Sequence, residues 1–145
     1  MESVSLVGTM AVYGSQAEVA AGVPTQWREF RLSHPELHPD ADFYGASPCT
    51  DDHKIHYLTG VAESAQDGSA AGQRLILAAG EYAVVRVEEA ARLRDTWVWM
   101  LTRWLPASGL RERKAPEFEK FKGVADDGLP LGPVEIWIPL EPLDR

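Results

Sequence analysis

Short stretches rich in β-branched and aromatic residues recur along the chain and predict strands, because such residues suit a pleated, half-buried surface. Within the first stretch, Gly8 indicates a bulge or a close approach of two backbones. The fourth and fifth stretches form either a strand pair or one strand that is bulged at Gly80. The expected strands cover residues 3–13, 42–46, 54–63, 75–79, 81–87, 116–122 and 134–140.

Apolar residues at helical spacing predict a first helix in the N-terminal half. Val23, Trp27 and Phe30 recur at intervals of four and three residues. This spacing favours a helix with Pro24 in its first turn, where the missing N–H of proline costs nothing. The helix is expected to end before Pro35.

A second helix is predicted over residues 88–105, and its pattern is the stronger of the two. Pro106 follows this segment and is expected to end it. One face of the predicted helix is apolar, as in a helix that packs on a sheet. The residues on that face are Leu93, Trp97, Met100, Leu101 and Trp104.

The order strand, helix, strand, strand occurs twice, in residues 1–63 and in residues 73–145. A small, polar linker over residues 64–72 separates the two halves. Units that cannot bury an apolar face alone usually pair. We therefore expect one α+β domain over residues 1–145, built from two βαββ units that superpose, with a ligand cleft between them.

A carboxylate lies among aromatic residues in the sixth predicted strand. With period 2, Glu117, Glu119 and Phe121 share one face of this strand. If the aliphatic face of the seventh strand packs on a helix, Trp137 lies on the opposite face of that strand, which we expect to be the side of Glu119. Burying an acid on an aromatic surface is costly without a partner. Glu119 therefore pairs with a cation or serves chemistry, and a place at a wet strand edge is the alternative.

Composition and charge limit the class of protein. A chain of 145 residues with 45% hydrophobic and 25% charged residues is typical of one soluble globular domain. The sequence has neither an apolar run of about 20 residues nor a signal-peptide pattern, so we expect a cytoplasmic protein without a membrane partner. A net charge of -8 disfavours direct binding to nucleic acid and mildly favours cationic partners. The oligomeric state, monomer or dimer, stays open.

Other kinds of site have weaker support in the sequence. The single cysteine, Cys49, excludes an internal disulfide framework, and no motif ties a histidine to it as in a nucleophilic pair. His34 and His38 are four residues apart, but Pro35 between them argues against a helical metal site. There is no glycine-rich phosphate loop. We therefore expect no metal and no cofactor.

Nine short motifs occur in order along the chain. In the second half they are Gly80-Glu-Tyr-Ala-Val-Val85, Thr96-Trp97, Trp104-Leu-Pro-Ala-Ser-Gly109, Pro116-Glu-Phe-Glu-Lys-Phe121 and Glu135-Ile-Trp-Ile-Pro-Leu140. In the first half they are Gly8, Pro24-Thr-Gln-Trp27, Phe43-Tyr-Gly45 and Tyr57-Leu-Thr-Gly60. In this combination the chain resembles the GyrI-like small-molecule-binding domain, which is also the effector-binding domain of AraC-type regulators.

The resemblance implies a fold of two SHS2-like βαββ repeats with a pocket between them. It also implies a pocket glutamate at the position of Glu119, and aromatic walls around lipophilic and often cationic ligands. There are two departures from the family pattern: Glu88-Glu89 stand where a small residue or glycine is usual, and Leu110 stands where an aromatic residue is common.

Seven residues are candidates for ligand binding. Trp99 lies about 200° around the helix from Trp97 and is expected to face the cleft. Tyr44 occupies the position in the first half that Glu119 occupies in the second, which would bring the two together across the cleft; Tyr44 is therefore also a candidate catalytic residue. Packing in the core is the alternative for several of the aromatic residues. The candidates are Glu119, Trp137, Trp99, Phe121, Tyr44, Tyr57 and Trp97.

Three functions are compatible with these observations. The first is capture of lipophilic, aromatic or cationic compounds, with Glu119 as counter-charge. The second, which the resemblance implies, is hydrolysis of cyclopropane-containing electrophiles, with Glu119 as general base on water. The third, also from the family, is a protein-interaction role like that of gyrase inhibitors.

Overall fold

The computed structural model describes residues 1–37, 40–63, 72–125, 129 and 133–142. Its helical elements are α1 (Gln16–Ser33), the 3-10 turn η2 (Ala90–Arg92), α2 (Leu93–Trp99), the π-helical η3 (Met100–Trp104) and α3 (Leu105–Ala107). Its strands are β1 (Val4–Tyr13), β2 (Asp42–Ser47), β3 (Ile55–Ala62), β4 (Gln73–Leu77), β5 (Tyr82–Val87), β6 (Leu110–Glu112), β7 (Glu117–Lys122) and β8 (Val134–Pro142). No helix in these ranges is long and apolar enough to cross a membrane. Of the predicted linker, residues 64–71 lie outside the described residues.

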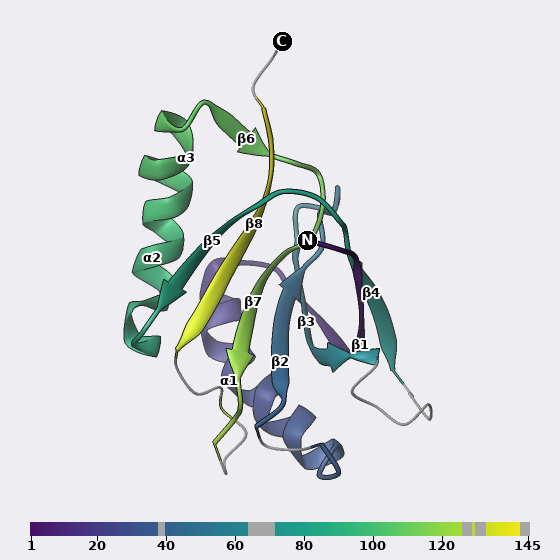
Figure 1. The fold of residues 1–145 in the computed structure, drawn as a ribbon. Coiled ribbons are helices and arrows are strands. Elements are labelled where there is room, and N and C mark those ends of the chain that lie inside the picture. The colour runs from purple at the N-terminus through teal and green to yellow at the C-terminus, as the bar shows by residue number, and fades with distance from the viewer. Residues whose placement is uncertain (38–39, 64–71, 126–128, 130–132, 143–145) are drawn as a thin grey trace.

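The strands form one antiparallel sheet in the order β4-β1-β3-β2-β7-β8-β5, and β6 pairs with β8. Strands β2 and β7 lie side by side near its middle (Figure 1). Outward from this pair the order is β2-β3-β1 on one side and β7-β8-β5 on the other. Each side thus repeats the same arrangement, which is consistent with the predicted duplication. Superposition of the two halves stays a prediction.

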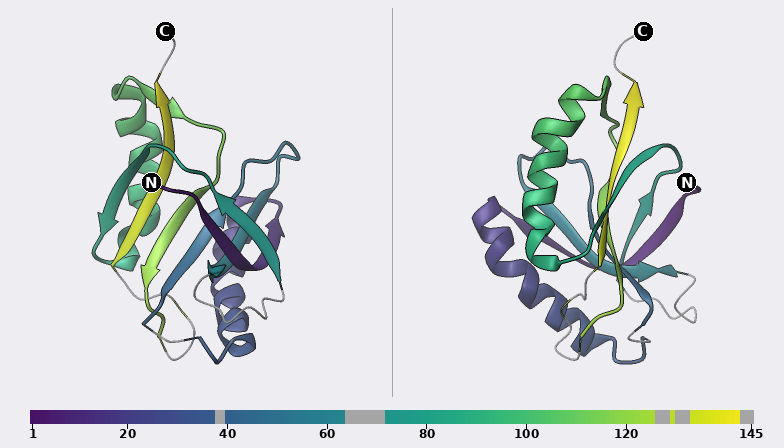
Figure 2. Two further views of the ribbon diagram at one scale, coloured as in Figure 1. Left: turned by 45° about the vertical axis from the view of Figure 1, so that its right-hand side comes forward. Right: turned by 60° about the vertical axis from the view of Figure 1, so that its left-hand side comes forward.

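Both long helical segments lie on the same face of the sheet (Figure 2). Under α1, Trp27 and Phe30 are each only 2% exposed and pack on one half of the sheet. Under the second helical segment, Met100 packs on Ile136 and its neighbours in the other half. Leu93 borders both cores. The fold is therefore α+β, with two layers and two helix-covered cores.

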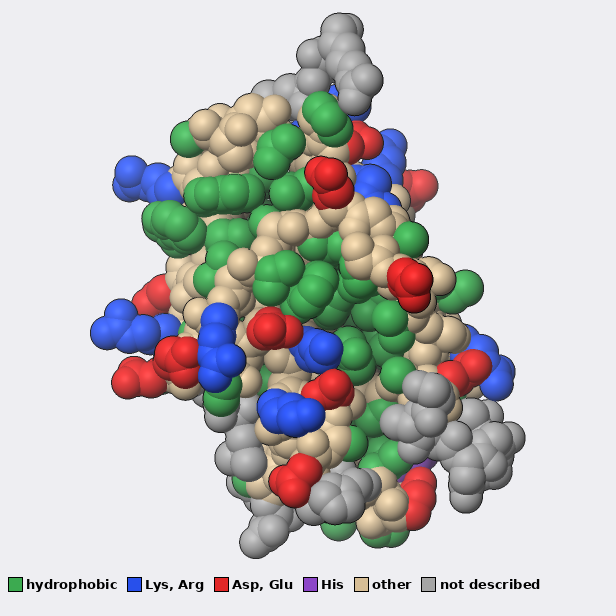
Figure 3. Space-filling view, in the orientation of Figure 1, with side chains coloured by type: hydrophobic (Ala, Val, Ile, Leu, Met, Phe, Trp, Pro, Cys, Tyr) green, Lys and Arg blue, Asp and Glu red, His purple; other side chains and the backbone are tan. Residues whose placement is uncertain are grey.

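The other face of the sheet turns toward the viewer in Figure 3, where hydrophobic side chains gather near its centre. Four aromatic rings meet on this face. Phe118 stacks on Trp137 with 5.3 Å between centroids, and Tyr82 lies edge-on to both rings. The ring centroid of Tyr44 lies 5.9 Å from that of Phe118. This cluster forms a third apolar core, on the face opposite the helices.

The first helix begins earlier than predicted. The Ser15 Oγ accepts a hydrogen bond from the backbone N–H of Glu18, and the Glu18 carboxylate accepts one from Gly14. This pattern resembles a capping box and starts α1 at Gln16. Pro24 consequently lies inside the helix, so its predicted place in the first turn is wrong. The Ser-x-x-Glu spacing was the better signal for the start.

The second helical segment begins at Ala90, two residues after the predicted start, and it is not uniform. In η3 the N–H of Leu105 bonds to the carbonyl of Met100, five residues back. Pro106 has no N–H for the ordinary bond to Thr102, and a wider turn of this kind avoids part of that loss. The helix continues to Ala107, past the predicted end. The predicted apolar face is confirmed by Met100, which is 1% exposed.

The close backbone approach expected at Gly8 is confirmed. Gly8 of β1 lies opposite Gly60 of β3. A Cβ atom on Gly8 would stand 2.0 Å from the carbonyl oxygen of Thr59. Only a residue without a side chain fits there, so the two strands can pair closely along their whole length.

Candidate functional site

A cleft of about 800 Å³ lies between α1 and α2, with the sheet as its floor. We call it the interhelical cleft. Strands β2, β3 and β7 supply the floor, and the two helices supply walls that are mainly apolar. The wall residues include Val19, Ala20, Val23 and Pro24 from α1, and Leu93, Trp97, Val98 and Leu101 from the second helical segment.

Glu119 of β7 lies on the floor of the interhelical cleft. Its Oε2 accepts a hydrogen bond from the indole N–H of Trp97 at 2.7 Å. Its Oε1 accepts one from the phenol of Tyr57 at 3.1 Å. The donors come from opposite halves of the chain, and both are neutral. The carboxylate is thus held in place without a cation.

Tyr57 is fixed in turn by residues of the first half. Its hydroxyl accepts a hydrogen bond from the indole N–H of Trp27 at 3.3 Å, and its side chain is 8% exposed. Gly45 lies directly opposite Glu119 in the pairing of β2 with β7. A Cβ atom on Gly45 would stand 1.9 Å from the Tyr57 hydroxyl. The missing side chain of Gly45 therefore makes the room in which the phenol reaches the carboxylate.

Removal from water raises the pKa of Glu119, and the hydrogen bonds from Trp97 and Tyr57 offset only part of this effect. Burial, and next the charge of Glu119, raises the pKa of Tyr57 well above its ordinary value. Tyr57 is therefore neutral at any physiological pH and keeps its proton for donation. The carboxylate of Glu119 is the group that can change its charge.

A second acid, Glu117, also lines the interhelical cleft. Its carboxyl group lies close to that of Glu112 of β6. Burial, followed by the nearby carboxylates of Glu112 and Glu119, raises the pKa of Glu117 to about 7. Among the described residues, no lysine, arginine or histidine forms an ion pair with Glu117 or Glu119. The two acids of the cleft therefore have no ion-pair partner among these residues, and Arg94, which also lines the cleft, is exposed.

The stability of the protein is expected to fall as the pH rises from about 5 to about 8. Folding raises the pKa of Glu117 from 4.5 to about 7, so between these values the folded state holds more protons than the unfolded state. Asp52, whose pKa a hydrogen bond from His56 lowers to about 2, titrates below this window. Scanning calorimetry across the range measures the trend. Glu117→Gln should flatten it, and a wild-type Tm that rises with pH would contradict the assignment.

Trp137 and Tyr44 lie on the other face of the sheet, away from Glu119. In the pairing of β7 with β8, Glu119 is opposite Ile136, whereas Trp137 is opposite Phe118. The expectation that Trp137 faces the side of Glu119 is therefore wrong. Tyr44 packs on Phe118 in the core of that other face, so its expected place across the cleft from Glu119 is wrong as well.

Trp99 and Phe121 also do not line the interhelical cleft. Trp99 is 49% exposed on the outer side of α2, so its expected direction toward the cleft is wrong. Phe121 shares the face of Glu119, as predicted, but it packs edge-on to Trp27 in the core under α1, with 5.5 Å between the ring centroids. Of the seven candidates, the structure brings together Glu119, Tyr57 and Trp97.

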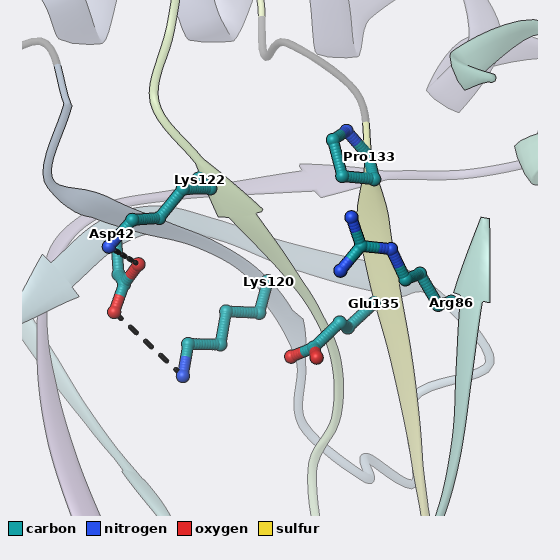
Figure 4. Close-up of a pocket in the computed structure, with 6 residues that line it drawn as sticks. All are labelled: Asp42, Arg86, Lys120, Lys122, Pro133 and Glu135. Carbon is teal, nitrogen blue, oxygen red and sulfur yellow. Dashed lines mark ion pairs between the residues drawn. The ribbon is translucent and has the colours of Figure 1, made fainter. Parts of the chain in front are cut away.

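A second cavity, of about 440 Å³, opens on the helix-free face of the sheet (Figure 4). Lys120 and Lys122 both pair with Asp42, at 3.8 and 3.4 Å. Arg86 pairs with Glu88 at 2.6 Å. Ion pairs of this exposed kind are typical of a solvated surface. We therefore take the interhelical cleft as the candidate site.

The sequence model of the GyrI-like small molecule binding domain matches residues 19–141. The chain belongs to this family. The match covers both walls and the floor of the interhelical cleft, and it makes small-molecule binding the general function of the domain. Among curated protein sequences, none matches the chain significantly.

Solved structures share the fold at low sequence identity. SAV2435 bound to tetraphenylphosphonium superposes with a TM-score of 0.74 at 19% identity, covering 97% of this chain and 90% of that one. An integron cassette protein of Vibrio cholerae superposes with a TM-score of 0.72 at 17% identity, covering 97% of this chain and 92% of that one. A putative bacterial transcription regulation protein from Staphylococcus aureus superposes with a TM-score of 0.71 at 18% identity, covering 97% of this chain and 94% of that one.

The candidates from the sequence did not include Gly45, Glu117 or Glu112. Gly45 was visible only as part of a family motif, and its role depends on where Tyr57 points. Glu117 shares the strand face of Glu119 at period 2, and this signal was sufficient to include it. Glu112 belongs to β6, a strand of three residues that is too short to show a pattern.

Proposed function

We propose that this GyrI-like domain captures lipophilic aromatic cations in the interhelical cleft, with Glu119 as the counter-charge. The observation that carries the proposal is a carboxylate on the floor of an apolar cleft, held by two neutral donors. A buried carboxylate without a cation is costly, and a bound cation would remove that cost. SAV2435, of the same fold, has been seen with tetraphenylphosphonium, a lipophilic aromatic cation.

The walls suit such a ligand as well. Apolar side chains from both helices would cover the hydrocarbon part of the molecule, and burying apolar surface contributes about 25 cal/mol per Å². The indole of Trp97 lines the cleft next to the carboxylate. A cation over an aromatic ring gains a further 0.5–2 kcal/mol, roughly, when it is desolvated. The interhelical cleft thus combines a negative charge with apolar walls.

The proposal predicts that a cation binds much more tightly than a neutral molecule of the same shape. A suitable pair is N-methyl-para-tolylpyridinium, the monocation probe, and para,para'-dimethylbiphenyl, the neutral probe. We expect at least about a tenfold difference in Kd, equivalent to about 1.4 kcal/mol. Quenching of tryptophan fluorescence can follow both titrations. Equal affinity for the two probes would contradict the role of Glu119 as counter-charge.

A second candidate function is hydrolysis of electrophilic cyclopropane-containing compounds. The raised pKa of Glu119 favours it, because a general base works best when its pKa lies near the working pH. Glu119 would take a proton from water as the water oxygen bonds to a carbon of the strained ring. The electron pair of the broken C–C bond would pass to the electron-withdrawing group of the compound, which would then take up a proton. Tyr57 would donate to the carboxylate and keep it oriented. This function differs from capture in that the ligand leaves chemically changed.

A further inference from the structure

Two carboxyl groups, not one, face into the interhelical cleft. Glu117 and Glu119 both line it and point to the helix side of β7, because they are two residues apart on one strand. The rise of a strand places such side chains about 7 Å apart. Glu119 is engaged by Tyr57 and Trp97, whereas Glu117 is engaged by Glu112. The two acids therefore sit in different surroundings on one floor.

We propose that Glu117 is a second anionic subsite and that the preferred ligands of the cleft are aromatic dications whose positive centres stand about 7 Å apart. This inference rests on the proposed function, since it takes Glu119 as the first cation site. It names a narrower ligand class, with one positive centre for each carboxylate.

The surroundings of Glu117 would allow its carboxyl group to ionise when a cation binds. Ser47 of β2 lies directly opposite it in the sheet, and Glu112 lies on β6. Glu119 is the nearest acid on its own strand, and Arg94 of α2 is an exposed basic residue that also lines the cleft. A proton held between Glu117 and Glu112 would reduce the repulsion of the two acids while the cleft is empty. A second positive centre would displace that proton and pair with the carboxylate.

Methyl viologen tests the inference, because it is a flat aromatic dication whose two nitrogen atoms are about 7 Å apart, close to the strand spacing. The monocation probe has the same shape with one positive centre. The measured quantity is the selectivity ratio, which is the Kd of the monocation divided by the Kd of the dication. Neither probe titrates, and the titration of Glu119 affects both, so the ratio reports mainly on Glu117.

For the wild-type protein we expect a ratio of about ten or more at pH 8, falling by up to about tenfold toward pH 6 as Glu117 takes up its proton. In Glu117→Gln the ratio should be close to one and should not change with pH. In Glu112→Gln the rise of the ratio should move to lower pH, because the new amide can donate a hydrogen bond to ionised Glu117. A misfolded variant would lose binding at every pH, so a shift of the pH dependence distinguishes a specific effect on Glu117 from damage to the fold.

Glu135→Gln is the matched control. It removes the same charge on the helix-free face, where Glu135 accepts a hydrogen bond from Trp137, and it should leave the ratio unchanged. A ratio that is flat with pH and equal in all four proteins would overturn the dication inference while leaving cation capture intact. Failure of both probes to bind the wild-type protein would instead overturn the proposed function.

Discussion

Replacing Glu119 by glutamine is expected to weaken binding of the monocation probe by roughly 1–3 kcal/mol, which is about five- to 150-fold. The neutral probe should lose little affinity, because it gains nothing from the charge. The variant keeps the shape of the side chain, so the difference between the two probes measures the counter-charge alone. Fluorescence titration of both probes against both proteins gives the four Kd values.

The fold should tolerate this substitution. The amide oxygen of the new side chain can accept the hydrogen bond of Trp97, and its N–H can donate to the Tyr57 hydroxyl. The phenol then loses the acceptor of its own proton, so a modest loss of unfolding free energy is expected. Glu135→Gln, on the helix-free face, provides a control with the same loss of charge. An equal loss of affinity for the two probes would mean that the substitution disturbs the cleft and that Glu119 is no counter-charge.

The same variant separates capture from hydrolysis. If Glu119 is a general base, Glu119→Gln should leave substrate affinity nearly intact and reduce turnover by about a hundredfold or more. The measurement is product analysis by mass spectrometry after incubation with a cyclopropane-containing electrophile. An unchanged compound recovered from the wild-type protein would count against the hydrolase.

Replacing Gly45 by alanine should both destabilise the protein and weaken cation binding. The new Cβ would stand 1.9 Å from the Tyr57 hydroxyl, so the phenol must move away from Glu119. Overpacking of this kind costs about 1–3 kcal/mol of unfolding free energy. Glu119 would also lose one of its two donors. Urea denaturation measures the stability, and titration with the monocation probe measures the binding.

The Tyr57→Val background shows whether the phenol is the cause. In that background the ring is absent and the alanine no longer overpacks, so adding Gly45→Ala should cost much less unfolding free energy than it does in the wild-type protein. The difference between the two costs is the coupling energy of the two sites. An equal cost in both backgrounds would mean that the alanine disturbs the strand pairing of β2 with β7 and not Tyr57.

The strand and helix order could be predicted from the sequence because its apolar periodicity is strong. The position of Trp137 could not, because it depends on register. The alternation shows that Ile136 and Trp137 face opposite ways, and Ile136 does face the helices. Which of them shares a face with Glu119 is decided by the pairing of β7 with β8, and a shift of one residue reverses the answer.

The duplication led to the same kind of error at Tyr44. Matching two repeats by pattern leaves an uncertainty of one residue, and in a strand one residue is a change of face. Tyr57 and Trp97 were candidates from the family motif and from the helix stripe, respectively. Their convergence on one carboxylate depends on three segments far apart in the chain, and no local pattern contains that information.

Part of each cleft wall lies outside the two helix-covered cores, which has a consequence for how such a protein can change over time. Val19 and Ala20 on one wall, and Val98 and Thr102 on the other, line the cleft but do not belong to either core cluster. Substitutions there alter the width of the opening without removing core packing. New ligand preferences can therefore be acquired, by natural drift or by directed evolution, at little risk to folding.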